Sequence, residues 1–293
     1  MTHAWMPSSP CGDGCVSDHG RRAGPVRTGL RCVGVAVLVS GLPVLVASAA
    51  LPPRWRSGLH RGYARSVLRI LGLRLRVRDE RDPAPGAGGV LVVAAHVSWL
   101  DVLALTAVDP GTYVARADLL DWPLIGPLTR RLRVVPIDRA RLRALPAVVD
   151  EVTALLRRGR RVVVFPEGTT WCGRAGGRLR PALFQAAIDA GTPVAPVALR
   201  YVGPGGPATG ACFVGEQTLV GSLVRVVRLR DVHIDVRLAP LQRPGTDRRE
   251  LATRCERLVR GGHGPFRNGG SPTGSSSADA APPAGAVRSP VAA

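Results

Sequence analysis

The chain has 293 residues and a mass of 30.8 kDa, which suits one sizeable α/β domain with appendages. Its 40 basic residues are all Arg and outnumber 21 acidic residues, so the net charge is +19. This balance excludes an acidic disordered chain and favours an anionic partner: nucleic acid, an anionic membrane surface or a phosphate-bearing substrate. The lack of Lys beside 35 Gly and 26 Pro is also typical of compositional drift, in which Arg carries no functional meaning.

The six cysteines show neither a complete metal-binding spacing nor a disulfide framework. Three residues separate Cys11 from Cys15, but no Cys or His pair follows at the spacing of a zinc finger. The other four are scattered, at Cys32, Cys172, Cys212 and Cys255. We therefore interpret all six as unpaired thiols in a reducing compartment and expect no bound metal.

Both ends of the chain have the composition of disordered segments. Residues 1–29 are polar, rich in Gly, Ser and Pro and without periodicity, so they are predicted to be a disordered leader. Residues 262–293 are predicted to be a disordered low-complexity tail. Four Arg and two Asp precede residue 32, and two Arg and one Asp follow residue 261, which leaves +16 on residues 32–261. The charge therefore belongs to the folded part.

Residues 30–75 are predicted to be a membrane-anchoring helical region. Residues 32–51 form a run of twenty residues without a charge, and such a run spans about 30 Å of hydrocarbon as a helix. We prefer a single span or a re-entrant helix bent at Gly41 and Pro43. A signal peptide cleaved after Ala47-Ser48-Ala49 and a buried core helix are the alternatives. Arg on both flanks leaves the orientation open.

Residues 58–73 have the pattern of an amphipathic helix. Leucine, valine and isoleucine side chains share a broad face opposite Arg61, Arg65 and Arg69. Such a helix is suited to lie on an anionic bilayer. A helix of the folded domain with a solvated basic face is an equally good interpretation.

Strand and helix patterns then alternate along residues 76–261. Runs of β-branched residues predict strands at 73–77, 90–94, 134–137, 162–165, 194–201 and 232–238. Helical periodicity predicts helices at 100–107, 142–156, 182–190 and 247–260, with a further short element at 211–214. This alternation favours a three-layer α/β fold.

The sharpest chemical motif follows the strand at 90–94. His96 comes at the carboxyl end of that buried strand, where open α/β sheets place their ligands. Ser98 suits a helix N-cap and Asp101 the third helical position, in a capping-box arrangement. That turn can bring the Asp101 carboxylate to one imidazole nitrogen and leave the other as a general base. A core histidine with Asp101 as a mere cap is the alternative.

Two more predicted strands end in polar turns. The strand at 162–165 is followed by Glu167 and Thr169, an acceptor and a donor, with Gly168 between them for close backbone approach. The strand at 134–137 is followed by Asp138 and Arg139. Each turn alone is weak evidence, but three polar strand ends together indicate one site.

Four blocks of the chain, taken in order, resemble those of the glycerolipid acyltransferase family, whose best-known members are the 1-acylglycerol-3-phosphate acyltransferases. The blocks are His96-x4-Asp101, Ile137-Asp138-Arg139, Phe165-Pro166-Glu167-Gly168-Thr169 and Val194-Ala195-Pro196-Val197-Ala198-Leu199. The match covers about residues 60–240. The resemblance implies an acyltransferase catalytic domain at residues 76–261, with a mixed, largely parallel sheet flanked by helices, behind a membrane-embedded helical region.

The resemblance also implies direct acyl transfer without a covalent acyl-enzyme. His96 would take the proton from the acceptor hydroxyl as it attacks the thioester of acyl-CoA or acyl carrier protein, and Asp101 would orient His96. The residues implied to bind the acceptor are Ser98, Arg116, Arg139, Glu167, Gly168 and Thr169, with guanidinium groups suited to a phosphate. No cofactor is implied beyond the acyl donor.

The implied acceptor is a lysophospholipid, most directly 1-acylglycerol-3-phosphate, at the cell membrane with the catalytic domain on the cytoplasmic side. Two positions depart from the family pattern: Ala95 stands where Asn usually precedes His, and Thr170 stands where Arg commonly follows Gly-Thr. Arg174, Arg178 or Arg180 could replace that Arg in space. Otherwise the acceptor is another lyso-lipid, such as a lyso-aminolipid.

A non-catalytic basic protein that binds membranes or nucleic acid is the alternative from another class. Against nucleic acid, aromatic residues make up only 4% of the chain and no nucleic-acid motif is present. Cys172 lies beside the third block, but it has no signature of a nucleophile and is interpreted as a bystander.

Overall fold

The computed structural model describes residues 6–16, 22–82, 86, 88–122, 126, 129–130, 134–138 and 140–261. All of these belong to one compact unit, Met1–His263. The predicted tail at 262–293 lies outside the described residues, as does Arg139.

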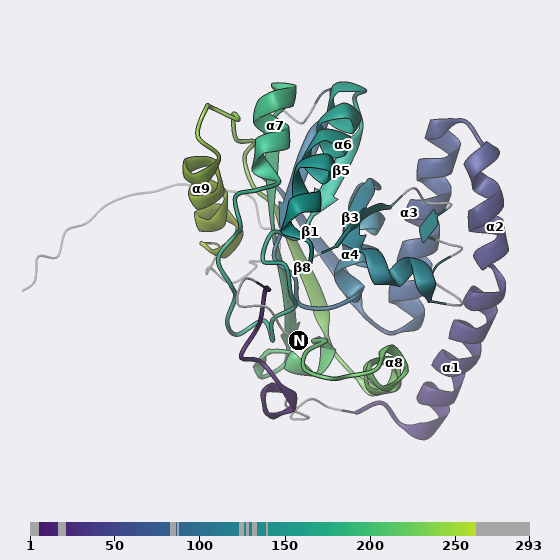
Figure 1. The fold of residues 1–293 in the computed structure, drawn as a ribbon. Coiled ribbons are helices and arrows are strands. Elements are labelled where there is room, and N and C mark those ends of the chain that lie inside the picture. Colours follow the sequence, from purple (N-terminus) through teal and green to yellow (C-terminus); the bar gives the residue numbers. More distant parts are fainter. Residues whose placement is uncertain are drawn as a thin grey trace, which may run out of the picture. The chain divides into compact units, whose positions relative to one another are not determined.

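The described strands form one mixed sheet in the order β1-β8-β6-β2-β5-β3-β4, with β7 paired to β6 (Figure 1). Their bounds are β1 Arg74–Asp79, β2 Val90–Ala94, β3 Thr112–Arg116, β4 Val135–Ile137, β5 Arg161–Val164, β6 Val194–Gly203, β7 Gly206–Pro207 and β8 His233–Leu238. Neighbours in this order run parallel except β6 and β8, which are antiparallel, as are β6 and β7. The predicted mixed, largely parallel sheet is confirmed.

Helices cover both faces of the sheet and complete the predicted three layers (Figure 1). Their bounds are α1 Pro25–Ser40, α2 Leu42–Ala47, α3 Pro53–Ile70, α4 Leu100–Val108, α6 Leu145–Arg157, α7 Phe184–Ala190, α8 Leu219–Arg228 and α9 Arg248–Arg260. One hydrophobic cluster joins the sheet to α3, α4 and α8, and a second joins it to α6, α7 and α9.

The central strand β2 divides its side chains between these two clusters. Val90, Val92 and Ala94 belong to the cluster with α3 and α4, whereas Leu91 and Val93 belong to the cluster with α6 and α7. A strand buried on both faces needs an unbroken apolar run, as here. Burial on both faces holds β2 in place, and the turn with His96 follows its carboxyl end.

Several elements differ from the sequence prediction. β3 and α8 were not predicted, and α3 begins five residues before the expected helix, at Pro53. The Thr218 side chain caps α8 by accepting from the N–H of Gly221 at 3.1 Å. Cys212 and Val214 are buried and Phe213 is half-buried, but residues 212–214 join no strand of the sheet; Phe213 instead donates its N–H to the carbonyl of Val97 at 2.9 Å.

The predicted disordered leader is wrong for its described residues. Residues 6–16 contain a short turn, Asp13–Cys15, and Cys11 is buried at 7% exposure within the cluster around α3 and α4. Residues 25–29 are already helical, because α1 begins at Pro25, a residue preorganised for a first helical turn. The polar composition of this segment did not reveal its apolar contacts, because they are made with distant parts of the folded domain.

α1 and α2 together form one candidate membrane span, Pro25–Ala47, with a mean hydropathy of 2.2. Only 11% of its apolar window is buried, so the alternative of a buried core helix is wrong. The exposed apolar side chains are Val26, Leu30, Val33, Val37, Val39 and Val44. Figure 1 shows both helices running along the outer side of α3.

Candidate active site

The site lies where two neighbouring parallel strands end. β2 and β5 pair in parallel, with Val93 opposite Val164, so their carboxyl ends lie at one edge of the sheet. The turn with His96 follows β2, and the turn with Glu167 follows β5. The sheet thus brings together two motifs that are 71 residues apart, as predicted from the strand ends.

His96 and Asp101 form a hydrogen-bonded pair. His96 Nδ1 lies 2.9 Å from Asp101 Oδ2, and that oxygen also accepts the backbone N–H groups of Val97 at 2.7 Å and Ser98 at 2.9 Å. The Asp101 side chain is fully buried, whereas the imidazole keeps 17% exposure. Because a carboxylate accepts, Nδ1 carries the proton in this arrangement, and Nε2 is left to exchange one with a substrate.

Tyr201 completes the environment of Asp101 and was missed by the sequence analysis. Its hydroxyl donates to Asp101 Oδ1 at 2.6 Å from the buried end of β6. Burial, together with the Asp101 charge, raises the pKa of Tyr201 well above its ordinary value, so the hydroxyl stays a donor. The available signal was its position at the end of the predicted strand 194–201.

Glu167 supports the backbone of His96. Its Oε2 accepts the His96 N–H at 2.9 Å, and Arg260 Nη2 lies 3.8 Å from its Oε1. Burial raises the pKa of Glu167 to about 7, although the His96 N–H and Arg260 both act to lower it. The Phe165 ring stacks on the imidazole at 4.1 Å between ring centroids. Arg260, on the last turn of α9, was also missed, since nothing in its own segment points to the site.

Gly168 occupies a position that requires glycine. Its φ is +75°, and a Cβ built there would lie 2.6 Å from the Pro7 ring and 3.8 Å from Arg180 Nε. Arg180 also donates its backbone N–H to the carbonyl of Pro166 at 3.0 Å. Of the three arginines considered as replacements for the family Arg, Arg180 is therefore beside the Glu167–Gly168 turn.

Ser98 does not have the predicted arrangement. α4 begins at Leu100 with Trp99 at its N-cap, and no side chain caps it. Ser98 Oγ is fully buried and has no hydrogen-bond partner among the described residues. The Asp101 carboxylate takes up the free N–H groups of this turn, so the hydroxyl is not needed as a cap.

Arg116 and Thr169, two of the remaining predicted residues, lie at the same sheet edge with different surroundings. Arg116 ends β3, two positions from β2 in the strand order, and its exposed guanidinium pairs with Asp118 at 2.6 Å. Thr169 is half-buried in the turn after β5. Arg139 lies outside the described residues, so its predicted role has no geometry here.

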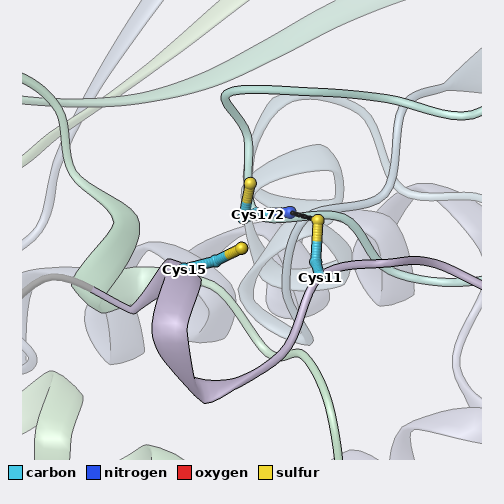
Figure 2. A group of neighbouring side chains, drawn as sticks. All are labelled: Cys11, Cys15 and Cys172. Atoms are coloured by element: carbon cyan, nitrogen blue, oxygen red, sulfur yellow. Dashed lines mark hydrogen bonds between the residues drawn. The ribbon is translucent and has the colours of Figure 1, made fainter.

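Three cysteines that were interpreted as unrelated lie together. The sulfur atoms of Cys11, Cys15 and Cys172 are all within 4.8 Å of one another (Figure 2). Cys172 directly follows Trp171, which donates its backbone N–H to the His96 carbonyl at 2.8 Å. The cluster therefore adjoins the backbone that carries the candidate active site.

Comparison with known proteins identifies relatives along most of the chain. A family model described as Acyltransferase matches residues 74–200. A lyso-ornithine lipid O-acyltransferase of Pseudomonas aeruginosa is 34% identical over 246 residues, which cover 82% of this chain and 90% of that protein. A 1-acyl-sn-glycerol-3-phosphate acyltransferase of Neisseria meningitidis serogroup B is 38% identical over 173 residues, covering 59% and 67% respectively.

One solved structure has the same fold. The 1-acyl-sn-glycerophosphate acyltransferase PlsC of Thermotoga maritima superposes with a TM-score of 0.63 at 17% identity, over 81% of this chain and 93% of that one. The fold, the paired strand-end motifs and the full-length relatives agree. The chain belongs to the glycerolipid acyltransferase family and is an acyltransferase.

Proposed function

We propose that this acyltransferase moves a fatty acyl group from acyl-CoA or acyl carrier protein to the free hydroxyl of a lysophospholipid. We take 1-acylglycerol-3-phosphate as the acceptor and phosphatidic acid as the product, the activity named for the Neisseria relative. The observation that carries the proposal is the His96–Asp101 pair, formed between the turn after β2 and the first turn of α4, with Nδ1 engaged by the carboxylate at 2.9 Å.

In this mechanism His96 Nε2 takes the proton of the acceptor hydroxyl while the oxygen attacks the thioester carbonyl carbon. The new C–O bond forms, the C–S bond breaks, and the imidazolium returns the proton to the leaving thiolate. Asp101 stabilises the imidazolium between these steps, and its own charge is held by Tyr201 and two backbone N–H groups. The acyl donor is a co-substrate, and these steps use no other cofactor.

The turn after β5 is proposed to receive the acceptor head group. Gly168 leaves room for close approach, Arg180 lies beside it, and Thr169 follows. Arg116 and Arg139, at or after the ends of β3 and β4, are proposed to bind phosphate at the same edge. A guanidinium can hold two phosphate oxygens at once, which suits a monoester head group.

The test is acyl transfer to 1-acylglycerol-3-phosphate by the purified full chain in detergent. His96→Ala should lower kcat about 10³-fold or more, and Asp101→Asn by about 10²-fold or more, because both remove general-base catalysis. His233→Ala, a histidine on β8 outside the site, is the matched control and should keep activity. Unchanged turnover in His96→Ala would sink the mechanism.

A second acceptor has its own support. The Pseudomonas relative, similar over most of its length, is named for lyso-ornithine lipid, an aminolipid. Thr170 stands where the family commonly has Arg, and its hydroxyl donates to the carbonyl of Phe213, so it supplies no positive charge to the site. A panel with equal amounts of both lyso-lipids decides: higher kcat/KM for the aminolipid would replace the glycerolipid assignment.

We further propose that α1 and α2 hold the enzyme in the cell membrane with the catalytic domain on the cytoplasmic side, where acyl donors are made. An anionic bilayer is the proposed partner, and no nucleic acid is expected. Beside α1 and α3 lies a cavity of about 760 Å³. Its arginines are Arg27, Arg31, Arg65, Arg69, Arg74 and Arg230. A reporter that works only in the cytoplasm should be active when it is fused after residue 293. Activity of a periplasm-specific reporter at the same position would reverse the proposed orientation.

A further inference from the structure

The three neighbouring thiols come from two distant segments. Cys11 and Cys15 belong to residues 6–16, and the turn Asp13–Cys15 brings them to the same side. Cys172 lies in the loop after β5 and donates its backbone N–H to Cys11 Sγ, 161 residues away, at 3.4 Å. Figure 2 shows the three side chains gathered in one place, with the Cys11 sulfur facing the backbone nitrogen of Cys172. Folding therefore assembles a group that sequence spacing alone does not reveal.

The thiols are withdrawn from solvent. Cys11 keeps 7% exposure and Cys172 keeps 5%, and Cys15 is half-buried. Cys212 is fully buried in the same hydrophobic cluster as Cys11 and Cys172. Thiols packed side by side without an acidic residue among them form a soft ligand set, which selects zinc over magnesium or calcium.

The backbone around Cys172 is arranged as it is around metal-bound thiolates. Gly173 has φ +83°, and this turn directs the N–H groups of Arg174 and Ala175 to the Cys172 sulfur. Hydrogen bonds from N–H groups to sulfur stabilise a thiolate and orient it toward a cation. A thiol that serves only as core packing needs no such pair of donors.

We propose that Cys11, Cys15 and Cys172 bind a thiophilic divalent cation, zinc in the first instance, as a structural site. Zinc in such sites is tetrahedral: the three thiolates supply three of its ligands, and water takes the fourth position. Binding exchanges the thiol protons for the cation and releases them to solvent. The proposed metal site takes no part in the chemistry at His96, so its test does not depend on which acceptor the enzyme uses.

The cation would fasten the amino-terminal segment across two loops. Pro7 packs on Gly168 in the turn after β5, and Gln217 donates to Asp13 Oδ1 at 3.1 Å. These two contacts are weak, whereas thiolate–metal bonds close a loop of about 160 residues and hold the segment firmly. The site therefore secures residues 6–16 beside the candidate head-group turn.

The first test is metal content of the purified full chain after growth with added zinc. Elemental analysis should find about one zinc per chain in the native protein. Cys11→Ser, Cys15→Ser and Cys172→Ser should each fall to about one-tenth of that or less. Cys32→Ser, which removes an exposed thiol on α1, is the matched control and should keep its zinc.

A second measurement uses the native chain, so it does not depend on the folding of variants. Replacing zinc by Co²⁺ should produce the charge-transfer bands of thiolate ligands, and a strong chelator should lower the Tm of the zinc-loaded native chain. Native protein without metal that also gives no thiolate–cobalt bands overturns the proposal. A Cys11–Cys172 disulfide found by mass spectrometry under reducing growth conditions would overturn it equally.

Discussion

Asp101 is a fully buried carboxylate, and it is surrounded by donors alone. His96 Nδ1 and two backbone N–H groups meet Oδ2, while the Tyr201 hydroxyl meets Oδ1. A buried carboxylate needs hydrogen-bond donors for its lone pairs, so each of these donors helps to hold Asp101 in place. The orientation of His96 therefore depends on β6 as well as on its own turn.

Tyr201→Phe tests this dependence. The change leaves Asp101 Oδ1 buried without its donor, which should cost about 1–3 kcal/mol of unfolding free energy. We expect kcat to fall about tenfold with KM little changed, since Tyr201 positions the dyad and does not touch substrate. Steady-state kinetics and thermal unfolding in detergent measure both effects.

Tyr113→Phe is the matched control for that variant. Tyr113 is half-buried, and its hydroxyl bonds Thr106 and the carbonyl of Val102, not Asp101. It should lose stability without the tenfold loss of kcat. Equal kinetics in the two variants would show that Tyr201 serves packing alone.

Glu167 gives the stability of the protein a defined pH dependence. Burial raises its pKa to about 7 from an ordinary 4.5, so the folded chain keeps a proton that the unfolded chain has released between these two pH values. Unfolding free energy should therefore fall as pH rises from about 4.5 to 7 and level off above, by about 3 kcal/mol in all.

Glu167→Gln removes this term, because an amide stays neutral. The variant should show a flatter stability profile than the native chain between pH 4.5 and 7, measured by unfolding at fixed pH values. Glu151→Gln, an exposed carboxyl on α6, should keep the native slope. Parallel profiles for Glu167→Gln and native protein would refute the raised pKa.

At the scale of elements, a buried guanidinium helps to tie α1 to the domain. Arg31 donates to the carbonyls of Val227 at 2.8 Å and Leu229 at 2.6 Å, at the end of α8. The guanidinium occupies the space in which a Cβ on Gly72 would lie, and Gly72 has φ +77°. One side chain thus joins the base of the candidate span to α8 and to the turn after α3.

Arg31→Met should loosen that connection. Both carbonyls would lose their donor, which costs about 1–3 kcal/mol of unfolding free energy, and α1 should become more sensitive to proteolysis. Arg27→Met, one turn earlier on the same helix and exposed, should behave as the native chain. Unfolding in detergent and limited digestion measure the difference, and identical behaviour of the two variants would contradict the assigned role of Arg31.

The elements that sequence could predict are those whose pattern is local. The run at 90–94 became β2 without a shift of either end, since a strand buried on both faces is apolar throughout. β3 was missed because only alternate side chains are buried, in a segment of five residues. The unbroken apolar pattern used for the central strands was absent there.

The residues of the candidate site also fall into two groups: those that local sequence could predict and those that only the fold brings to the site. The His96–Asp101 turn and the Glu167 turn could be predicted because each is local and each follows a strand. Tyr201, Arg260 and the partners of Cys172 could not, since their positions at the site depend on strand order and on the return of the chain ends. The expected position of Ser98 as an N-cap was wrong. A capping pattern does not tell whether the Ser98 hydroxyl or the Asp101 carboxylate accepts the N–H groups of the turn.

At the scale of the molecule, the charge of +16 on residues 32–261 has a structural component. Many arginines donate to backbone carbonyls: Arg31, Arg65, Arg130, Arg157, Arg200, Arg225, Arg237 and Arg254. Guanidinium groups used this way close loops and helix ends and need no anionic partner. The many arginines in the composition are therefore not by themselves a sign of an anionic partner. Six arginines line the cavity beside α1 and α3.

Membrane attachment should then depend mainly on the apolar surface of α1 and α2, and little on charge. Val33 and Val37 are 63% and 64% exposed on α1, so the double change Val33→Asp and Val37→Asp alters no core contact. Each Asp in a span costs about 2.5–3.5 kcal/mol of insertion. The variant should leave the membrane on alkaline carbonate washing, whereas the native chain should stay through both carbonate and high salt. Val77→Asp, an equally apolar exposed position on β1, should stay bound as well. Release of the native chain by salt alone would mean that the arginines, and not the span, hold it there.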